Sequence, residues 1–479
     1  MRYLLLLSHL VLTTTRNFEN FNPPFNRKIL FLQPGKKVPP WLQRLTFIGL
    51  IAILTINCEV DIQYTPIDSP DDTSSDHSPD IHYGLPVLPN VSGFGLNTVG
   101  GKGGQIIKVT NLDKQGPGSL KEAIETSGPR IIVFEVGGVI DLEGEANLVV
   151  REPYVTIAGQ TAPSPGITII RGGLRINHVH EVIVQHITVR TGEAGHAKQS
   201  GWNRDAISTW NAHDVIIDHC TATWGTDENL SVAGSWSSGD TPEEWQQNTS
   251  HRVTVSNCIS AHGLDNSTHS KGSHSMGTLI ADGTNEILFY GNLWAHNKRR
   301  NPFVKANCDR IVIANNYIYN YGVVAIHTEY NVNQWGPIYP PFSVIAIEGN
   351  KLEPGPSTAN SYHISFYGGA DVYIHDTEGE IHWDEGEPTW FDERPFWPEG
   401  LIARPSSEVK YWVLENAGSR PWDRDPLTVQ LIDDIKAGGG RIIDSEAEVG
   451  GYPSYTPTYR EFNIDDWDME TMTKKNGMP

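Results

Sequence analysis

The sequence predicts an all-β protein wound as a right-handed parallel β-helix, a solenoid in which coils of chain stack on one another. The main observation is a short β-branched strand that recurs along the chain between polar or turn residues. Copies of this strand begin near residues 155, 182, 215, 253, 287, 311 and 344. A repeat of roughly 24 to 38 residues is typical of solenoids, whereas a β-propeller blade takes about 40 to 50 residues.

A second and a third strand follow most copies of the first. The second strands begin near residues 187, 220, 258, 292 and 316, and the third near 206, 230, 278, 302 and 324. Three short strands in each repeat, with insertions of variable length, predict three parallel sheets along the solenoid. Adjacent coils lie about 4.8 Å apart in such a fold, so equivalent residues of successive coils form columns.

One predicted column lies at a turn inside the coils. It contains Asn292, Asn316 and Asn350, with Cys220 and Cys258 in the coils before them. Stacked cysteines can form a disulfide or remain free thiols, and the sequence leaves both open. The chain has four cysteines and no Cys-x-x-Cys pair, so it is not a disulfide-built scaffold.

Two short helices are predicted as caps for the ends of the solenoid. Residues 118–129 form the first, because Ser119 and Glu122 have the spacing of a capping box and Gly128 with Pro129 ends the helix. We expect this helix to plug the N-terminal end of the core. Residues 426–437 predict a second helix at the other end.

The N-terminal segments indicate export. Residues 1–57 contain two apolar stretches, the second with the length of a signal-peptide core, and predict a cleaved leader. Cys58 closes this stretch as in a bacterial lipoprotein; an ordinary secretory signal is the alternative. Residues 58–89 predict a disordered tether, and residues 90–479 one β-helix domain with a C-terminal packing segment from about residue 355. We expect a secreted protein or one lipid-anchored to a bacterial outer membrane or cell surface.

The charge of the chain bears on its partners. The formal net charge is -21 at pH 7, and nucleic-acid-binding proteins are usually basic, so that class is disfavoured. An acidic protein can still bind an acidic polymer where its cations gather. The most basic window is 296–305, which contains Lys298, Arg299, Arg300 and Lys305.

Charged residues fall along one predicted edge of the solenoid. Asp205 directly precedes the third strand of its coil, and Asp227 and Glu228 precede the third strand of the next. Lys271 and Arg300 lead into the third strands of the two coils that follow. At a spacing of about 4.8 Å per coil, this edge is roughly 15 Å long and suits an extended polymer.

Several segments, taken in order, resemble the pectate lyase family, polysaccharide lyase family 1, and in particular its bacterial exported members. The resemblance covers roughly residues 90–355 and, more weakly, the tail to Tyr452. The segments that carry it are 93–95, 118–123, 202–208, 215–232, 253–260 and 300–305.

The resemblance implies an enzyme that cleaves pectate (polygalacturonate), or a related uronic-acid polymer, by β-elimination to unsaturated oligosaccharides. Calcium then bridges enzyme carboxylates and the substrate uronate, and an arginine removes the C5 proton before the C4–O bond breaks. Arginine is an unusual base, since its pKa exceeds about 12, so this role rests on the resemblance alone. The positions implied are Arg300 as base, Asp205 and Asp227 as calcium ligands, and Lys271 and Lys305 as substrate contacts. To these we add Glu228 as a further calcium ligand, and Lys298 and His269, which lie near Arg300 and Lys271 in the sequence, as further substrate contacts.

Two positions depart from the family pattern. The family often has a further aspartate where this chain has Ser231, and it carries an arginine where this chain has Lys305. Whether calcium is required is therefore left open, and Lys305 lacks the bidentate geometry of arginine.

Two other functions stay open. A polygalacturonase-type glycoside hydrolase needs a pair of carboxylic acids, but Asp227 and Glu228 are adjacent and would point in opposite directions on an extended strand. A non-catalytic glycan-binding β-helix gives no reason to place Lys271 and Arg300 beside aspartates. Residues 367–404 are rich in aromatic side chains, which form either a sugar-stacking wall or a packed cover. We expect a monomer whose partner is an acidic polysaccharide.

Overall fold

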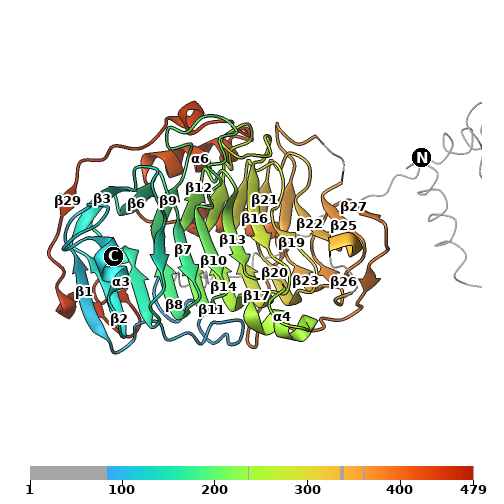
Figure 1. The fold of residues 1–479 in the computed structure, drawn as a ribbon, viewed down its shortest axis with the longest axis horizontal. Coiled ribbons are helices and arrows are strands. Elements are labelled where there is room, and N and C mark those ends of the chain that lie inside the picture. Colours follow the sequence, from blue (N-terminus) through green and yellow to red (C-terminus); the bar gives the residue numbers. More distant parts are fainter. Residues whose placement is uncertain (1–82, 236, 335–338, 360–361, 478–479) are drawn as a thin grey trace, which may run out of the picture. The chain divides into compact units, whose positions relative to one another are not determined.

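The computed structural model describes residues 83–477 except residues 236, 335–338 and 360–361. The predicted leader, Cys58 and most of the predicted tether lie outside these residues. The described chain is a right-handed parallel β-helix, in which three sheets extend along the molecule and their strands run across its long axis (Figure 1). Among the described residues, no helix is long and apolar enough to cross a membrane.

The first sheet has 11 strands in the order of the chain. Its strands are β1 (Gln105–Val109), β2 (Arg130–Phe134), β5 (Val155–Ala158), β8 (His180–Gln185), β11 (His213–Asp218), β14 (His251–Ser256), β17 (Asn285–Tyr290), β20 (Asp309–Ala314), β23 (Val344–Glu348), β26 (Asp371–His375) and β28 (Thr389–Trp390).

The other two sheets have nine strands each. The groove sheet, named for the hollow described below, contains β4 (Leu148–Val150), β7 (Leu174–Asn177), β10 (Ile207–Trp210), β13 (Glu228–Ala233), β16 (Met276–Ile280), β19 (Phe303–Val304), β22 (Ile326–Glu329), β25 (Ile364–Tyr367) and β27 (Ile381–Asp384). The flank sheet contains β3 (Val136–Asp141), β6 (Ile167–Ile170), β9 (Ile187–Arg190), β12 (Thr221–Thr223), β15 (Ile259–Ala261), β18 (Leu293–Ala295), β21 (Tyr317–Tyr319), β24 (Lys351–Glu353) and the antiparallel β29 (Thr458–Tyr459).

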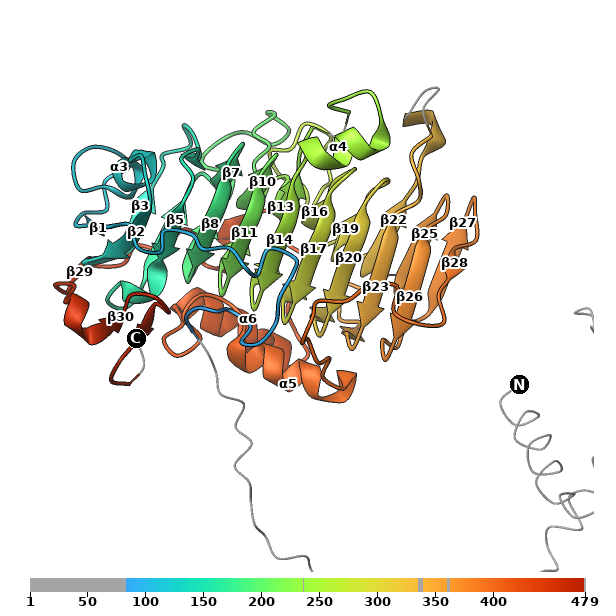
Figure 2. The ribbon, with the colours of Figure 1, turned by 90° about the horizontal axis from the view of Figure 1, so that it is seen from below.

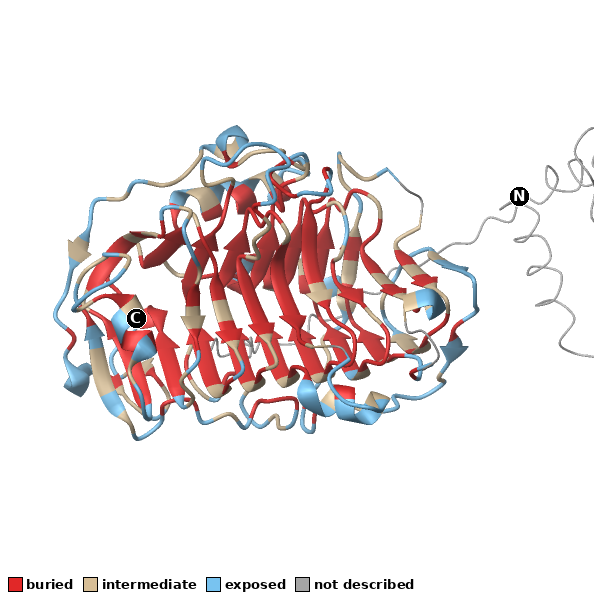
Figure 3. Cartoon of the chain, in the orientation of Figure 1, coloured by how far each residue is buried: buried red, intermediate tan, exposed pale blue. Residues whose placement is uncertain are grey.

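The register of the first sheet confirms the predicted repeat. Val155, Val182, Val215, Val253, Ile287 and Ile311 are consecutive partners and are all buried, as β-branched residues packed inside a coil should be. The next member of this column is Ile345. Strand β23 begins at Val344, as predicted, and the residue in the column is the one that follows. Figure 3 shows buried strands surrounded by more exposed loops and helices.

The asparagine column forms as predicted. The backbone N–H of Cys258 donates to Asn292 Oδ1 at 2.9 Å, and that of Asn292 donates to Asn316 Oδ1 at 2.9 Å. The N–H of Asn316 donates to Asn350 Oδ1 at 3.0 Å. Cys220 and Cys258 are both free, so the thiol alternative holds.

Helix α3 (Leu120–Glu125) is the predicted N-terminal cap. The Ser119 hydroxyl accepts from the Glu122 N–H, and the Glu122 carboxylate accepts from the Gly118 N–H at 2.7 Å. Leu120 and Ile124 are buried against the core, which the helix closes.

The second helix does not cap the other end. Helices α5 (Ser406–Asn416) and α6 (Pro426–Lys436) lie along the side of the solenoid (Figure 2), where Leu431 and Ile432 pack with Ile259 and Leu293. The expectation of a C-terminal cap was therefore wrong. The flank sheet offers apolar side chains that match the apolar stripe of α6.

The ends of the domain differ from the expected boundaries. Val87, which the sequence analysis placed in the tether, is buried against Ile183 and Ile216. The coils also continue beyond residue 355, through β25, β26, β27 and β28. Helix α4 (Pro242–Asn248) and the short pair β30 (Trp467–Asp468) and β31 (Thr473–Lys474) complete the named strands and α-helices.

The aromatic insertion divides into two parts. Trp383 and Trp390 lie on the last coil and are 44% and 40% exposed. Phe396 and Trp397 instead pack against the apolar cluster outside the first sheet. The insertion is therefore partly cover and partly open surface.

Candidate active site

Three carboxylates converge at the start of two neighbouring strands of the groove sheet. Asp205 precedes β10, and Asp227 and Glu228 stand at the start of β13. One oxygen from each lies within 4.8 Å of the others, and Asp205 Oδ1 accepts the Glu228 N–H at 3.2 Å. The expectation that Asp227 and Glu228 point apart was wrong, because the chain bends at Asp227 and becomes a strand only at Glu228.

Crowding changes the proton affinity of these carboxylates. Burial, together with the charge of Asp227, raises the pKa of Asp205 to about 6. Burial raises the pKa of Glu228 well above its ordinary value even though Arg300 is beside it. Burial also acts on Asp227, but a hydrogen bond from His274 holds the pKa of Asp227 below its ordinary value. The cluster therefore holds more negative charge than the protein alone stabilises.

Two stacked histidines support Asp227. His274 Nε2 lies 2.9 Å from Asp227 Oδ1, His269 Nε2 lies 3.5 Å from it, and the two ring centroids are 3.7 Å apart. His269, expected to contact substrate, is only 2% exposed and faces Asp227. His274 was missed, and the sequence offered only the short spacing between the two histidines as a signal.

Arg300 reaches back along the groove sheet to the acidic cluster. Its guanidinium forms an ion pair with Glu228 and lies 5.2 Å from the centre of the Phe303 ring. The backbone of Arg300 has φ of 62°, a left-handed conformation that is uncommon for a residue with a side chain. The predicted base is thus held beside the predicted calcium ligands.

The predicted substrate-binding lysines differ in their partners. Lys298 Nζ lies 2.9 Å from Asp265 Oδ2, and Lys305 Nζ lies 3.3 Å from Glu329 Oε1. Lys271 is exposed, and its side chain forms no ion pair with the residues that the structure describes. Lys271 is therefore the most available of the three ammonium groups.

A hollow of about 260 Å³ lies beside the acidic cluster on the groove sheet. All three carboxylates and Ser231 line it, and so do two arginines that the sequence analysis did not select, Arg175 and Arg204. The alternating pattern of β7, with apolar Leu174 and Ile176 around Arg175, was an available signal that this arginine faces outward.

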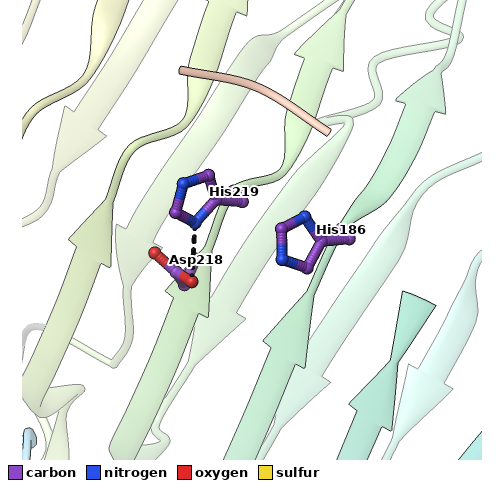
Figure 4. Close-up of side chains that lie close together, drawn as sticks. All are labelled: His186, Asp218 and His219. Carbon is purple, nitrogen blue, oxygen red and sulfur yellow. Dashed lines mark hydrogen bonds and ion pairs between the residues drawn. The ribbon is translucent and has the colours of Figure 1, made fainter. Parts of the chain in front are cut away.

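A second group of possible metal ligands lies outside the hollow. His186, Asp218 and His219 are buried close together (Figure 4), and His219 Nδ1 lies 2.8 Å from Asp218 Oδ2. The Asp218 oxygens also accept from Gln185, Ser256 and Asn257. Because hydrogen bonds already satisfy Asp218, this group is structural.

No protein-family profile matches the chain. “Probable pectate lyase C” of Aspergillus terreus is 32% identical over 386 residues, 77% of this chain and 81% of that protein. “Probable pectate lyase C” of Emericella nidulans is 32% identical over 426 residues, 82% of this chain and 85% of that protein.

Solved structures were compared as well. A pectate lyase from Bacillus sp. N165, in complex with trigalacturonate, is similar at a TM-score of 0.45 and 14% identity, over 68% of this chain and 98% of that one. The two sequence relatives named above are fungal, so the bacterial source expected from the sequence stays a prediction. The identity and coverage of those relatives establish that the chain belongs to the pectate lyase family.

Proposed function

We propose that this protein is an exported lyase that cleaves polygalacturonate, or a related uronic-acid polymer, by β-elimination. The observation that carries the proposal is the ion pair of Arg300 with buried Glu228, whose carboxylate converges with those of Asp205 and Asp227. An excess of carboxylates beside a cation suits a reaction in which a metal ion and a substrate carboxylate both enter the site.

The acidic cluster fits calcium. Its donors are carboxylate oxygens, the ligands that calcium prefers. Burial and the charge of Asp227 raise the pKa of Asp205, and a bound cation would oppose both effects. Asp205, Asp227 and Glu228 would hold the ion. When bound, calcium supplies positive charge that neutralises the substrate carboxylate and makes the C5 proton more acidic. Ser231 lines the same hollow, but it provides a hydroxyl in place of a further carboxylate.

The roles of the basic residues follow from their partners. Arg300, as the neutral guanidine, would accept the C5 proton. The C5–H electron pair then forms the C4–C5 double bond, and the C4–O bond breaks with its electrons on the leaving sugar oxygen, which takes up a proton. Because Arg300 is paired with Glu228 as a cation, it must leave Glu228 and lose its own proton before it can act as the base. Exposed Lys271 would bind a substrate carboxylate directly, and Lys305 would do so by exchanging Glu329 for the substrate.

One observation favours a hydrolase as the second candidate. Asp205 and Glu228 both have a raised pKa, as the proton donor of a glycoside hydrolase does. The ion pair between Arg300 and Glu228 has no role in that mechanism, so we place hydrolysis second.

The proposal also includes export by a leader within residues 1–57, with lipid attachment at Cys58 in a bacterial cell surface. The support is the sequence pattern alone. Fractionation of cells that produce the wild type and Cys58→Ala tests it. Loss of the protein from the membrane fraction in the variant is expected for a lipid anchor.

The activity test uses the purified protein with polygalacturonate, in calcium or in a chelator. We expect ultraviolet absorbance from the conjugated double bond to increase with time, and Arg300→Ala to lower the rate about 1,000-fold, the scale of a general base. Arg310→Ala is the matched control, because Arg310 pairs with Glu286 on the first sheet. Formation of reducing ends without absorbance would show hydrolysis. If neither reducing ends nor absorbance appears, the protein would only bind glycans.

A further inference from the structure

Arg175 and Arg204 distinguish one end of the hollow. Arg175 projects from β7, one coil before Asp205, and Arg204 directly precedes Asp205. In the part of the chain that the structure describes, neither forms an ion pair with a carboxylate. The Nε–H of each is buried without an acceptor. The Nε–H groups of Arg190, Arg404, Arg420 and Arg424 share this feature, so it does not by itself indicate a ligand. Arg175 and Arg204 differ from them because both line the hollow beside the acidic cluster, where a bound ligand can supply an acceptor.

Both guanidinium groups lie over indole rings. Arg175 Cζ lies 5.0 Å from the centre of the Trp210 ring, and Arg204 Cζ lies 4.4 Å from that of Trp202. Stacking satisfies the face of a guanidinium and leaves its N–H edge for a planar anion. The backbone of Arg204 is also fixed, because its N–H donates to Thr226 Oγ1 at 3.0 Å. The two side chains are therefore positioned before any ligand binds.

Of the other groove cations, Lys271 also lacks an ion pair among the described residues, but it is exposed and its ammonium group can bind water. Arg300, Lys298 and Lys305 each pair with a carboxylate of the protein. In a chain with a net charge of -21, two arginines without a carboxylate partner form a local site of positive potential. Such a site selects an anionic ligand, and a planar carboxylate matches the arginine edge in two hydrogen bonds.

We infer that Arg175 and Arg204 form a carboxylate-binding subsite at the β7 end of the hollow, for a uronate ring other than the one whose C5 proton is removed. This inference rests on the proposed function. The guanidinium of Arg300 pairs with Glu228 at the start of β13, and β7 lies two strands from β13 in the groove sheet, so about 10 Å of coil stacking separates the strand of Arg175 from the predicted base. The enzyme therefore prefers substrates with several consecutive unesterified uronates, because only these reach the subsite with a free carboxylate.

The test compares oligogalacturonates of increasing length. For Arg175→Gln with Arg204→Gln, we expect kcat/KM to fall about tenfold or more on the longest oligomers and far less on the shortest, since charged hydrogen bonds are lost only where the chain reaches them. Arg310→Gln, which removes one positive charge from the first sheet, is expected to lose nothing at any length. Thermal unfolding of all variants shows whether they are folded.

Two results would overturn the subsite. One is an unchanged kcat/KM of the double variant at every length. The other is an equal loss at every length, which would place the arginines at the cleaved bond or in the stability of the fold.

A binding assay distinguishes failure of the subsite from failure of the proposed lyase activity. Tryptophan fluorescence is titrated with an unesterified hexagalacturonate and with its methyl ester, which removes the charges and keeps the sugar. If wild type forms no unsaturated product, the proposed function fails. A preference for the unesterified hexamer that disappears in the double variant still supports the subsite, and equal preference in both proteins rejects it.

Discussion

The flank sheet and the groove sheet are built by the same coils, but they treat charge in opposite ways. On the flank, Arg190 donates to both oxygens of Asp425, at 2.8 and 3.0 Å, and also to Thr223 and Thr428. On the groove, Arg204 has no carboxylate partner and Asp205 is repelled by its neighbours. The flank therefore pairs its buried arginine with a carboxylate, whereas among the described residues of the groove neither Arg204 nor Asp205 forms an ion pair.

This difference indicates which face of the solenoid carries the function. A folded protein gains stability when every buried polar group has a partner, and departures from that rule concentrate at functional sites. Helices α5 and α6 cover the flank, so its polar groups can be satisfied permanently. The groove is open, and its charges are available to a ligand. Variants of the flank should therefore change stability, and variants of the groove should change activity.

The largest effect is expected from Asp425→Asn on the flank. This change leaves the guanidinium of Arg190, which is 3% exposed, buried without its charge partner. Loss of one member of a buried pair costs about 3–5 kcal/mol of unfolding free energy. Chemical denaturation measures this loss. Activity per folded molecule should remain close to that of the wild type, because Asp425 lies outside the groove.

Asp433→Asn provides the matched control for this prediction. Asp433 is on the same helix, α6, but is exposed. The free energy of unfolding of the Asp433→Asn variant should stay within about 0.5 kcal/mol of that of the wild type, as for most surface changes. An equal loss in both variants would mean that the charge of α6, and not the pair with Arg190, stabilises the flank.

The second prediction is a loss of stability in acid that arises away from the groove. His296 stacks on His262 with ring centroids 4.8 Å apart, receives a hydrogen bond from Asn320, and has the edge of Tyr319 beside it. Burial lowers the pKa of His296 from 6.5 to about 4. The unfolded chain binds this proton near pH 6.5, so stability is full above pH 6.5 and is lost as the pH falls towards 4.

The loss from His296 should be on the order of 3 kcal/mol, from a shift of two to three pKa units. Unfolding free energy measured from pH 7.5 to 4.5 should fall less steeply in His296→Gln, which cannot take up the proton and keeps an acceptor for Asn320. Parallel curves for the two proteins would contradict a role for His296 in acid lability.

The repeat could be predicted from the sequence because each coil depends on local pattern. β-Branched residues such as Val182, Val215 and Val253 recur at the same place in each coil, and stacking aligns them regardless of the insertions between. The position of α6 could not be predicted in this way. An amphipathic helix fits any apolar surface, and the sequence does not say whether the end or the flank of a solenoid is exposed.

The site was predictable only as a set of positions. The stacking of equivalent residues in successive coils predicted Asp205, Asp227 and Arg300 along one edge, and they lie there in the structure. The pattern of stacked residues could not show that Arg300 reaches back to Glu228, because side-chain length and backbone conformation decide that contact. It also missed His274, whose loop folds over Asp227 from a long insertion. Loops of this kind follow no repeat.

The third prediction tests the groove itself through Glu228→Gln. Glu228 is the carboxylate common to the acidic cluster and the ion pair with Arg300. Replacement of this carboxylate by a neutral amide should lower the lyase rate about 100-fold at limiting calcium. This corresponds to a rise of about 2.7 kcal/mol in the activation free energy. If Glu228 acts as a calcium ligand, added calcium should restore much of the rate. If it only positions Arg300, added calcium should restore none.

Glu329→Gln is the matched variant, because Glu329 also pairs with a groove cation, Lys305, but lies outside the acidic cluster. Its effect on the rate should be within about threefold, since a partly exposed ion pair contributes little. Freed Lys305 should bind substrate at least as well as before. A loss as large as that of Glu228→Gln would mean that pairing of the cations, and not the convergence of the three carboxylates, makes the groove active. In that case the contrast between the groove and the flank would disappear, because both faces would depend on satisfied pairs.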